Sequence, residues 1–327
     1  RFGDSGCLWR KAPESLMEFT EAQEARTIGV GLVPEGAFRN ALEQKKAMTA
    51  LQPKVLGAEG GWQPYGIGPQ VQDQAYADGS RDGIPVNAGR VDNFAYDDVR
   101  QRLFAAVGNG GIWMTEAIGG DVATLASPAS PWRSIGDGLP IQVTSAVAWT
   151  PAQGGRVIAL TGEHTQGGNS YVGLGVYWSD DLGATWNHAE GVPDGALAFK
   201  LAVDQSNPKV IYAATGKGLF RSQDAGETFV NVKLPTSEEC AGIESAGKCG
   251  VANMVTDVVV RQPGGLSLAG LDWSICDIKG CPVLAAVGYR AGNLPYADGT
   301  PQSPGNGLYR SDTGAAGSFL RVSPALP

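Results

Sequence analysis

Charged and aromatic side chains that could bind a ligand gather in segments rich in glycine, where neither a strand nor a helix is expected. They are Glu163, His164, Asp194, Tyr289, Arg290, Tyr296 and Asp298. An aromatic ring beside a carboxylate and an arginine suits a sugar or a peptide, because the ring stacks while the charged groups form directional hydrogen bonds. The alternative is that each of them is a solvated loop residue, since loops carry such side chains in many proteins.

Catalytic residues cannot be assigned from the sequence. Glycoside hydrolysis needs two carboxylates about 5 to 9.5 Å apart, but the 33 Asp and Glu residues are too many for carboxylates alone to discriminate. The chain contains no Gly-x-Ser-x-Gly elbow, phosphate-binding loop or dinucleotide fingerprint. Its two histidines leave little scope for a Ser-His-Asp triad or a His-rich metal centre. We therefore expect no metal and no cofactor.

The composition is that of a folded protein that does not bind nucleic acid. Hydrophobic residues make up 43% and charged residues 18% of the 327 residues, which is typical of globular proteins. The net charge is −8, and no run of Lys or Arg could neutralise successive phosphates. No stretch approaches the roughly 20 apolar residues of a membrane span. The sequence begins at Arg1, which fits either removal of a signal peptide or a piece of a longer chain.

The cysteines predict two local disulfides. Cys240 and Cys249 flank a short loop that contains Gly, Ser and Glu, and Cys276 and Cys281 enclose a turn-like tetrapeptide. Disulfides imply an oxidising compartment, so we expect an extracellular, cell-surface or periplasmic location. A zinc site is the alternative, but neither pair has the C-x-x-C spacing. Cys7 is left over, either as a free buried thiol or as the partner of a segment outside this sequence.

The chain has two regions with different sequence patterns. Residues 1–60 form an N-terminal extension with one or two predicted helices, because residues 35–51 place apolar side chains at helical spacing and residues 15–26 are strong helix formers. From residue 61 onward, short apolar runs alternate with Gly, Pro, Asn and Asp. Such runs, without helical patterns between them, predict an all-β domain over residues 61–327.

The apolar runs repeat along this domain. Residues 157–162, followed by 175–186, match residues 210–216, followed by 218–229. The interval is that of one four-stranded propeller blade, about 40 to 45 residues. Two weaker copies flank this pair. The four predicted blades cover approximately residues 86–134, 143–190, 199–234 and 251–323.

The end of each strong copy carries a motif that points to a known family. The pattern Ser-x-Asp-x-Gly-x-Thr-Trp is complete at residues 179–186 and has Phe in place of Trp at residues 222–229. It resembles the Asp box of sialidases, sortilin-type receptors and xyloglucanase-like propellers. Residues 34–42, 62–69, 89–91 and 110–113 resemble the opening of large exported bacterial proteins with BNR repeats. The resemblance implies an Asp-box β-propeller with about four blades in this chain and a short helical N-terminal extension.

The motif residues are expected to be structural. Ser and Asp side chains can hydrogen-bond the backbone of a tight turn, Gly supplies a positive φ, and the aromatic ring covers the edge of the blade. In the family this turn joins the third and fourth strands at the outer rim. The residues assigned this role are Ser179, Asp181, Gly183, Thr185, Trp186, Ser222, Asp224, Gly226, Thr228, Phe229 and Ser311.

If the blades follow this pattern, the loops that carry the seven candidate ligand-binding residues emerge on the face opposite the Asp-box turns. Function in a repeat scaffold usually lies on such loops, because the strands are committed to packing. We expect an exported binding or assembly module that recognises a glycan or a protein partner through this face, without catalysis.

Two alternatives remain open, a secreted glycoside hydrolase and a structural surface-layer or filament component. Xyloglucanase-like relatives carry a catalytic Asp where this chain has Asn109, and an amide cannot act as a base. The three-arginine cluster of sialidases cannot be assembled convincingly from Arg81, Arg90, Arg156 and Arg290.

We also expect a further polypeptide to complete the propeller. Propellers of this type close with more than four blades, and an open end exposes an apolar sheet face. A continuation of the same polypeptide is our first choice and a partner subunit our second. A self-contained four-bladed ring is the alternative.

Overall fold

The computed structural model describes the blades and parts of the N-terminal segment. The described residues are 90–116, 131–164, 171–236, 253–261, 282–288 and 305–323, with two short strands, β1 (Gln70–Val71) and β2 (Val86–Asn87), and the helical residues 39–41, 43, 44 and 47. The chain forms two compact units, residues 1–55 with 166–169 and residues 56–165 with 170–327. In the first, the described helical residues fall within the segment predicted as a helix.

Four antiparallel sheets of four strands each form most of the second unit, and each sheet follows the chain in order. The all-β prediction is confirmed, and the sheets have the form of propeller blades. Blade 1 contains β3 (Val91–Asp97), β4 (Arg102–Val107), β5 (Gly111–Thr115) and β6 (Arg133–Ser134). Blade 2 contains β7 (Thr144–Thr150), β8 (Arg156–Thr161), β9 (Val176–Ser179) and β10 (Asn187–His188). Blade 3 contains β11 (Ala198–Val203), β12 (Ile211–Thr215), β13 (Gly218–Ser222) and β14 (Val230–Asn231). Blade 4 contains β15 (Val255–Val260), β16 (Val283–Val287), β17 (Gly307–Ser311) and β18 (Leu320–Arg321).

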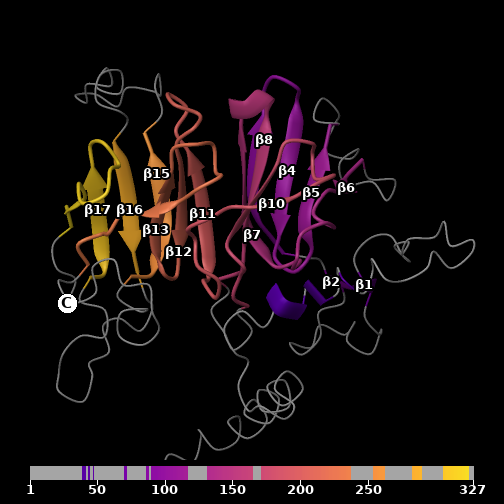
Figure 1. The fold of residues 1–327 in the computed structure, drawn as a ribbon, viewed down its shortest axis with the longest axis horizontal. Helices are drawn as coiled ribbons and strands as arrows, with labels where there is room; N and C mark the ends of the chain where they lie inside the picture. The colour runs from indigo at the N-terminus through magenta and orange to yellow at the C-terminus, as the bar shows by residue number, and fades with distance from the viewer. Residues whose placement is uncertain are drawn as a thin grey trace, which may run out of the picture. The chain divides into compact units, whose positions relative to one another are not determined.

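Consecutive blades pack face to face. Strand β3 contacts β7, β7 contacts β11, and β11 contacts β15, so the first strands of neighbouring blades lie together. Figure 1 labels three of them, β7, β11 and β15. In blades 2 and 3, every residue of the second strand, β8 or β12, is buried. This explains why these strands have apolar runs without alternation, because a strand covered on both faces has no solvent side. Among the described residues, no helix has the length and apolar character needed to cross a membrane.

The turn between β9 and β10 is held by its own side chains. The Ser179 hydroxyl donates to Asp181 Oδ1 at 2.7 Å and accepts the Gly183 N–H at 2.8 Å. Asp181 in turn accepts the Thr185 N–H at 2.8 Å and the Thr185 hydroxyl at 2.6 Å. The turn between β13 and β14 repeats these contacts with Ser222, Asp224, Gly226 and Thr228. Both turns therefore satisfy backbone N–H groups that no strand partner serves.

The aromatic residue that closes the first of these turns connects two blades. Trp186 donates its indole N–H to the Ile135 carbonyl, at 2.9 Å, and packs against the core between blades 1 and 2. Phe229 is buried in the core between blades 2 and 3. In blade 4, the Ser311 hydroxyl accepts the N–H groups of Thr313 and Gly314, at 3.1 and 2.7 Å.

Candidate functional site

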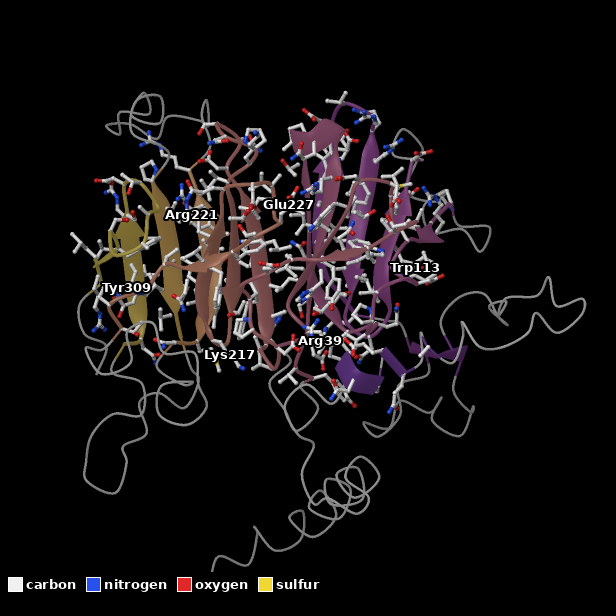
Figure 2. The ribbon with its side chains drawn as sticks, viewed as in Figure 1. Arg39, Trp113, Lys217, Arg221, Glu227 and Tyr309 are labelled. Carbon is white, nitrogen blue, oxygen red and sulfur yellow. The ribbon has the colours of Figure 1, made fainter. Side chains whose placement is uncertain are left out.

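The blades present two different ends to solvent. Strand β8 pairs with β9 so that Val157, at its start, lies opposite Ser179, while Glu163 follows its end. Glu163 and Ser179 therefore lie at opposite ends of blade 2. We call the end with Glu163 and Lys217 the loop face and the end with Ser179 and Ser222 the turn face. Figure 2 shows this separation in blade 3, where Lys217 lies at the lower end of the sheet and Glu227 toward its upper end.

A shared guanidinium organises the loop face. Arg90 Nε donates to Asp92 Oδ1 at 2.6 Å, and Arg90 Nη2 donates to Asp92 Oδ2 at 3.1 Å. The same Nη2 also donates to Glu163 Oε2 of blade 2. The side chains of Asp92 and Glu163 are 8% and 2% exposed, whereas that of Arg90 is 39% exposed. The contact thus joins the first strand of blade 1 to a loop of blade 2 through nearly buried carboxylates.

Two glycines make room for this contact. Gly162 has a φ of +105°, and a Cβ there would lie 2.8 Å from Gly173 N and 2.9 Å from the Ala196 carbonyl oxygen. A side chain at this position would be both strained and in collision, so glycine allows the turn that brings Glu163 inward. At Gly108, a Cβ would lie 2.6 Å from Arg90 Nη2, so glycine leaves space for the guanidinium.

An aromatic pair lies directly beside Glu163. The His164 ring stacks on Phe199 with a centroid distance of 5.0 Å and an interplanar angle of 27°. His164 Nδ1 lies 2.9 Å from the Ala198 carbonyl oxygen, which orients the ring. Both rings are partly exposed. A flat, partly exposed ring pair can stack against the apolar face of a planar or pyranose ligand.

In the part of the cluster that the structure describes, Arg90, Asp92 and Glu163 carry more negative than positive charge. Hydrogen bonding to Asp92 is the largest cause that raises the pKa of Arg90, although burial opposes it, and Glu163 adds to the rise. The guanidinium of Arg90 pairs with the carboxylates of both Asp92 and Glu163, so its positive charge is already neutralised by these two side chains. Such an arrangement favours hydroxyl groups over anionic ligands, because carboxylate oxygens accept hydrogen bonds from hydroxyls and repel anions. Both carboxylates accept hydrogen bonds from Arg90 here, whereas a general acid must donate a proton.

The structure brings together only some of the predicted site residues. Glu163 and His164 meet Arg90 and Phe199, as described above. Asp194 belongs to a different contact, because its backbone carbonyl accepts a hydrogen bond from Lys217 Nζ at 2.6 Å. Tyr289, Arg290, Tyr296, Asp298 and the five cysteines, Cys7, Cys240, Cys249, Cys276 and Cys281, lie outside the described residues.

Arg90, Asp92 and Phe199 were not among the predicted site residues. Asp92 and Phe199 occupy equivalent positions, because each is the residue skipped by the register shift in the first strand of its blade. An irregular residue of this kind turns out of the strand pattern and is often used to aim a side chain. The shift follows from strand pairing, which periodicity in one sequence does not reveal.

A second hollow runs along the first strands of blades 1 to 3. This groove of about 600 Å³ is lined in part by Phe94 and Tyr96 of β3, Trp149 of β7 and Leu201 and Val203 of β11. Phe94 is 56% and Tyr96 45% exposed. Polar residues, among them Asn93 and Asp98, also line this groove, and its described lining contains no carboxylate pair.

Comparison with known proteins gives partial matches. No family model matches the chain. An alignment 121 residues long, which covers 32% of this chain and 14% of the relative, is 31% identical to a xyloglucanase of Hypocrea jecorina (strain QM6a). An ancestral GH74 enzyme has a TM-score of 0.44 at 15% identity, over 71% of this chain and 25% of its own. The GH74 xyloglucanase from Xanthomonas campestris has a TM-score of 0.29 at 14% identity, over 75% of this chain and 33% of its own.

Proposed function

We propose that this chain is the binding part of an exported Asp-box β-propeller and that its loop face recognises a neutral glycan without catalysis. The observation that carries the proposal is the Arg90 guanidinium shared between Asp92 and Glu163. The stacked rings of His164 and Phe199 lie next to it. Together they offer an aromatic platform beside charged hydrogen-bonding groups, which is the combination that sugar hydroxyls and ring faces require.

Neutral sugars fit this cluster better than acidic ones. Sialic acid or uronic acid would need an arginine whose charge is available to a carboxylate. Among the described residues, one guanidinium faces two nearly buried carboxylates, so Arg90, Asp92 and Glu163 together carry a net negative charge. A protein partner is the second class of ligand, and it would need a matching basic or hydroxyl-rich loop.

Glycoside hydrolysis is the second candidate function, and the partial match to a xyloglucanase favours it. That relative is named for acting on xyloglucan, a neutral polysaccharide, so both candidates point to the same substrate class. Two features argue for binding without hydrolysis. Asn109, exposed in the turn between β4 and β5 on the loop face, has an amide in place of a base, and Asp92 and Glu163 accept hydrogen bonds from Arg90.

The test is titration calorimetry of the full chain with soluble xyloglucan, a neutral mannan and polygalacturonate, alongside release of reducing ends from each. We expect binding to a neutral polysaccharide, no binding to polygalacturonate and no hydrolysis. The His164→Ala substitution should weaken binding by about fivefold, since an aromatic stacking contact contributes about 1 kcal/mol. The control is Arg310→Gln, which disrupts an exposed pair with Asp312 and should leave binding unchanged.

Each outcome separates the candidates. Hydrolysis that disappears in Glu163→Gln would replace the binding proposal with the enzymatic one. Binding that survives both His164→Ala and Arg90→Gln would move the site away from this cluster. Failure to bind any polysaccharide, by a chain with a cooperative unfolding transition, would favour a protein partner or a structural role.

A further inference from the structure

A small pocket on the turn face is lined by charged side chains from blades 1 and 2, and its volume is about 230 Å³. Blade 1 contributes Arg100 and Arg102, at the hairpin between β3 and β4, and blade 2 contributes Asp180 and Asp181, from the turn after β9. Sites for drug-sized ligands have about 300 to 1,000 Å³, so this pocket suits one small molecule. Glu163 lies at the other end of blade 2, and the pocket is therefore separate from the site of the proposed function.

The two arginines of the pocket can both donate to a ligand. Arg100 is 46% exposed, and its guanidinium donates to the Gly154 carbonyl at 3.3 Å and lies 3.9 Å from Asp97 Oδ2. Arg102 donates through Nε to Glu116 at 2.9 Å, and Glu116 is 58% exposed. An exposed ion pair contributes little to stability, so Arg102 can exchange Glu116 for a ligand carboxylate at small cost. A guanidinium has several N–H donors, and these contacts occupy only some of them.

Gly155 leaves space where two donors of the pocket converge. It has a φ of +112°, and a Cβ at this position would lie 3.1 Å from Arg100 Nη1 and 3.7 Å from Trp149 Nε1. Both nitrogens therefore face one point beside Gly155. The Trp149 indole N–H makes no hydrogen bond to any residue that the structure describes. A carboxylate placed at this point could accept hydrogen bonds from both donors.

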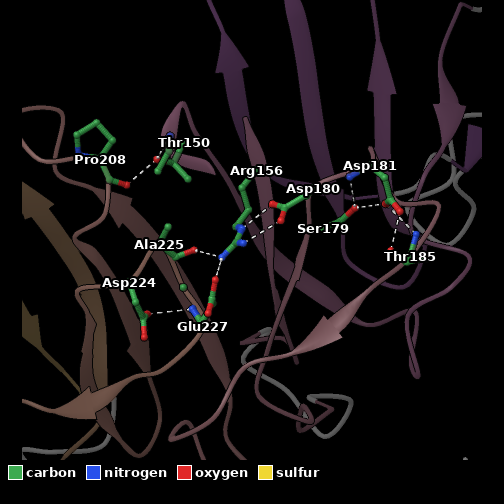
Figure 3. A network of polar contacts seen from close by, with 12 residues as sticks. Thr150, Arg156, Ser179, Asp180, Asp181, Thr185, Pro208, Asp224, Ala225 and Glu227 are labelled. Carbon is green, nitrogen blue, oxygen red and sulfur yellow. Dashed lines mark hydrogen bonds and ion pairs between the residues drawn. The ribbon is translucent and has the colours of Figure 1, made fainter. Parts of the chain in front are cut away.

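The two aspartates of the pocket are held in place by hydrogen bonds. Arg156 donates to both Asp180 oxygens, at 2.6 and 2.9 Å, and Thr185 donates twice to Asp181 (Figure 3). The hydrogen bonds from Thr185, with a smaller contribution from Ser179, lower the pKa of Asp181, so this side chain is charged at neutral pH. A carboxylate has about four lone-pair sites, so each aspartate can accept a further hydrogen bond from a ligand ammonium.

We infer that this pocket binds a free amino acid with an apolar side chain, as its zwitterion. Two arginines and two aspartates give the described lining no net charge, so a ligand with a single charge would meet like charges on one side of the pocket. An amino acid presents both signs, with its carboxylate toward the arginines of blade 1 and its ammonium toward the aspartates of blade 2. Leu182 also lines the pocket and can contact the apolar side chain.

The test compares three forms of one amino acid by titration calorimetry of the full chain. L-leucine carries both charges, leucinamide carries only the positive charge, and N-acetyl-leucine carries only the negative charge. All three keep these charges at about pH 6. We expect L-leucine to bind and each analogue to bind about tenfold more weakly, since each analogue loses hydrogen bonds between charged groups.

Two substitutions test whether the ligand lies in this pocket. Arg102→Gln removes one guanidinium, and Trp149→Phe removes the indole N–H but keeps an aromatic ring. Each should weaken L-leucine binding by about tenfold, because each removes a donor to the carboxylate. The control is Arg310→Gln, which disrupts the exposed pair with Asp312 and should leave L-leucine binding unchanged. Urea denaturation should show a cooperative transition for every variant.

Three results would overturn the inference. An analogue that binds as tightly as L-leucine would show that one charge is enough. Binding of L-leucine that survives both Arg102→Gln and Trp149→Phe would exclude this pocket as its site. The absence of L-leucine binding at millimolar concentration, with the folded wild-type chain, would exclude an amino-acid site on the turn face.

Discussion

Arg156 of blade 2 and Glu227 of blade 3 form a hydrogen bond of 3.1 Å across the boundary between the two blades. The Arg156 side chain is 2% exposed, donates to both Asp180 oxygens at 2.6 and 2.9 Å, and reaches the Ala225 carbonyl at 3.1 Å (Figure 3). Its guanidinium also lies 3.8 Å from the centre of the Trp178 ring. Burial alone would lower the pKa of Arg156, but the hydrogen bonds to Asp180 and Glu227 outweigh it and raise the pKa.

Arg156→Met should destabilise the chain substantially. The substitution keeps the apolar stem but leaves the Ala225 carbonyl and two carboxylates without their donor. We expect a loss of about 2 kcal/mol in the free energy of unfolding, since hydrogen bonds to charged groups contribute about 1.5 to 3 kcal/mol. Urea denaturation measures it. Arg310→Met is the matched control, because its partner Asp312 is 67% exposed, and it should cost less than about 0.5 kcal/mol. Equal losses in the two variants would contradict a linking role for Arg156.

Two glycines with similar φ values allow the cost of backbone strain to be measured separately from the cost of a steric clash. Gly183 and Gly154 have φ values of +85° and +83°, but a Cβ at Gly183 would lie 2.0 Å from the Ile135 carbonyl oxygen, and at Gly154 it would meet nothing within 4 Å. Gly154→Ala should cost about 1 kcal/mol from strain alone. Gly183→Ala should cost about 3 kcal/mol or more, because backbone of blade 1 must also move. Thermal unfolding of both variants provides the comparison, and similar melting temperatures would argue against close packing of this turn on blade 1.

The aspartates of the turn face should make stability sensitive to acid. Burial opposes the change at Asp224, but hydrogen bonds from Thr228 and Ser222 prevail and lower its pKa below the ordinary value of 3.8. Hydrogen bonds from Thr185, from its hydroxyl first, lower the pKa of Asp181 likewise. Because the folded pKa is depressed, the stabilisation is present above the unfolded value and is lost as the pH falls through the folded pKa. Urea unfolding between about pH 5 and pH 2 should therefore show declining stability, with a shallower decline in Asp224→Asn. An unchanged slope in that variant would exclude Asp224 as a cause.

The fold could be read from the sequence because each blade repeats the same local pattern. The apolar runs at residues 157–162 and 210–216 became β8 and β12, and the glycines after them fell in turns. Repetition strengthens a weak periodic signal, since four copies have to agree on one register. The two disulfides remain predictions, because the cysteines lie outside the described residues, and thiol labelling of the unfolded, unreduced chain would test them.

The site could be read only in part. Glu163 and His164 stood out as charged residues in a glycine-rich loop, which is a local signal. Arg90 and Phe199 did not, because their role depends on which blades meet. Arg90 reaches Glu163 across 73 positions of sequence, and Phe199 reaches His164 from the next blade. Such contacts follow from packing between sheets, which composition and spacing within one segment do not encode.

The coupling between Arg90 and Glu163 can be measured with a double-mutant cycle. Glu163→Gln keeps the shape of a side chain that is 2% exposed, and Arg90→Met removes the guanidinium while keeping the stem. Arg90→Met should cost about 2 kcal/mol, because it leaves a nearly buried carboxylate without its cation. In the double variant that carboxylate is absent, so the total cost should fall short of the sum by about 1 to 2 kcal/mol. The same cycle at Arg310 and Asp312, an exposed pair with the same sequence separation as Arg90 and Asp92, should give coupling below about 0.5 kcal/mol. Urea denaturation of the four chains in each cycle measures both couplings. Additive changes in the free energy of unfolding at Arg90 and Glu163 would show that the contact between blades 1 and 2 does not stabilise the loop face.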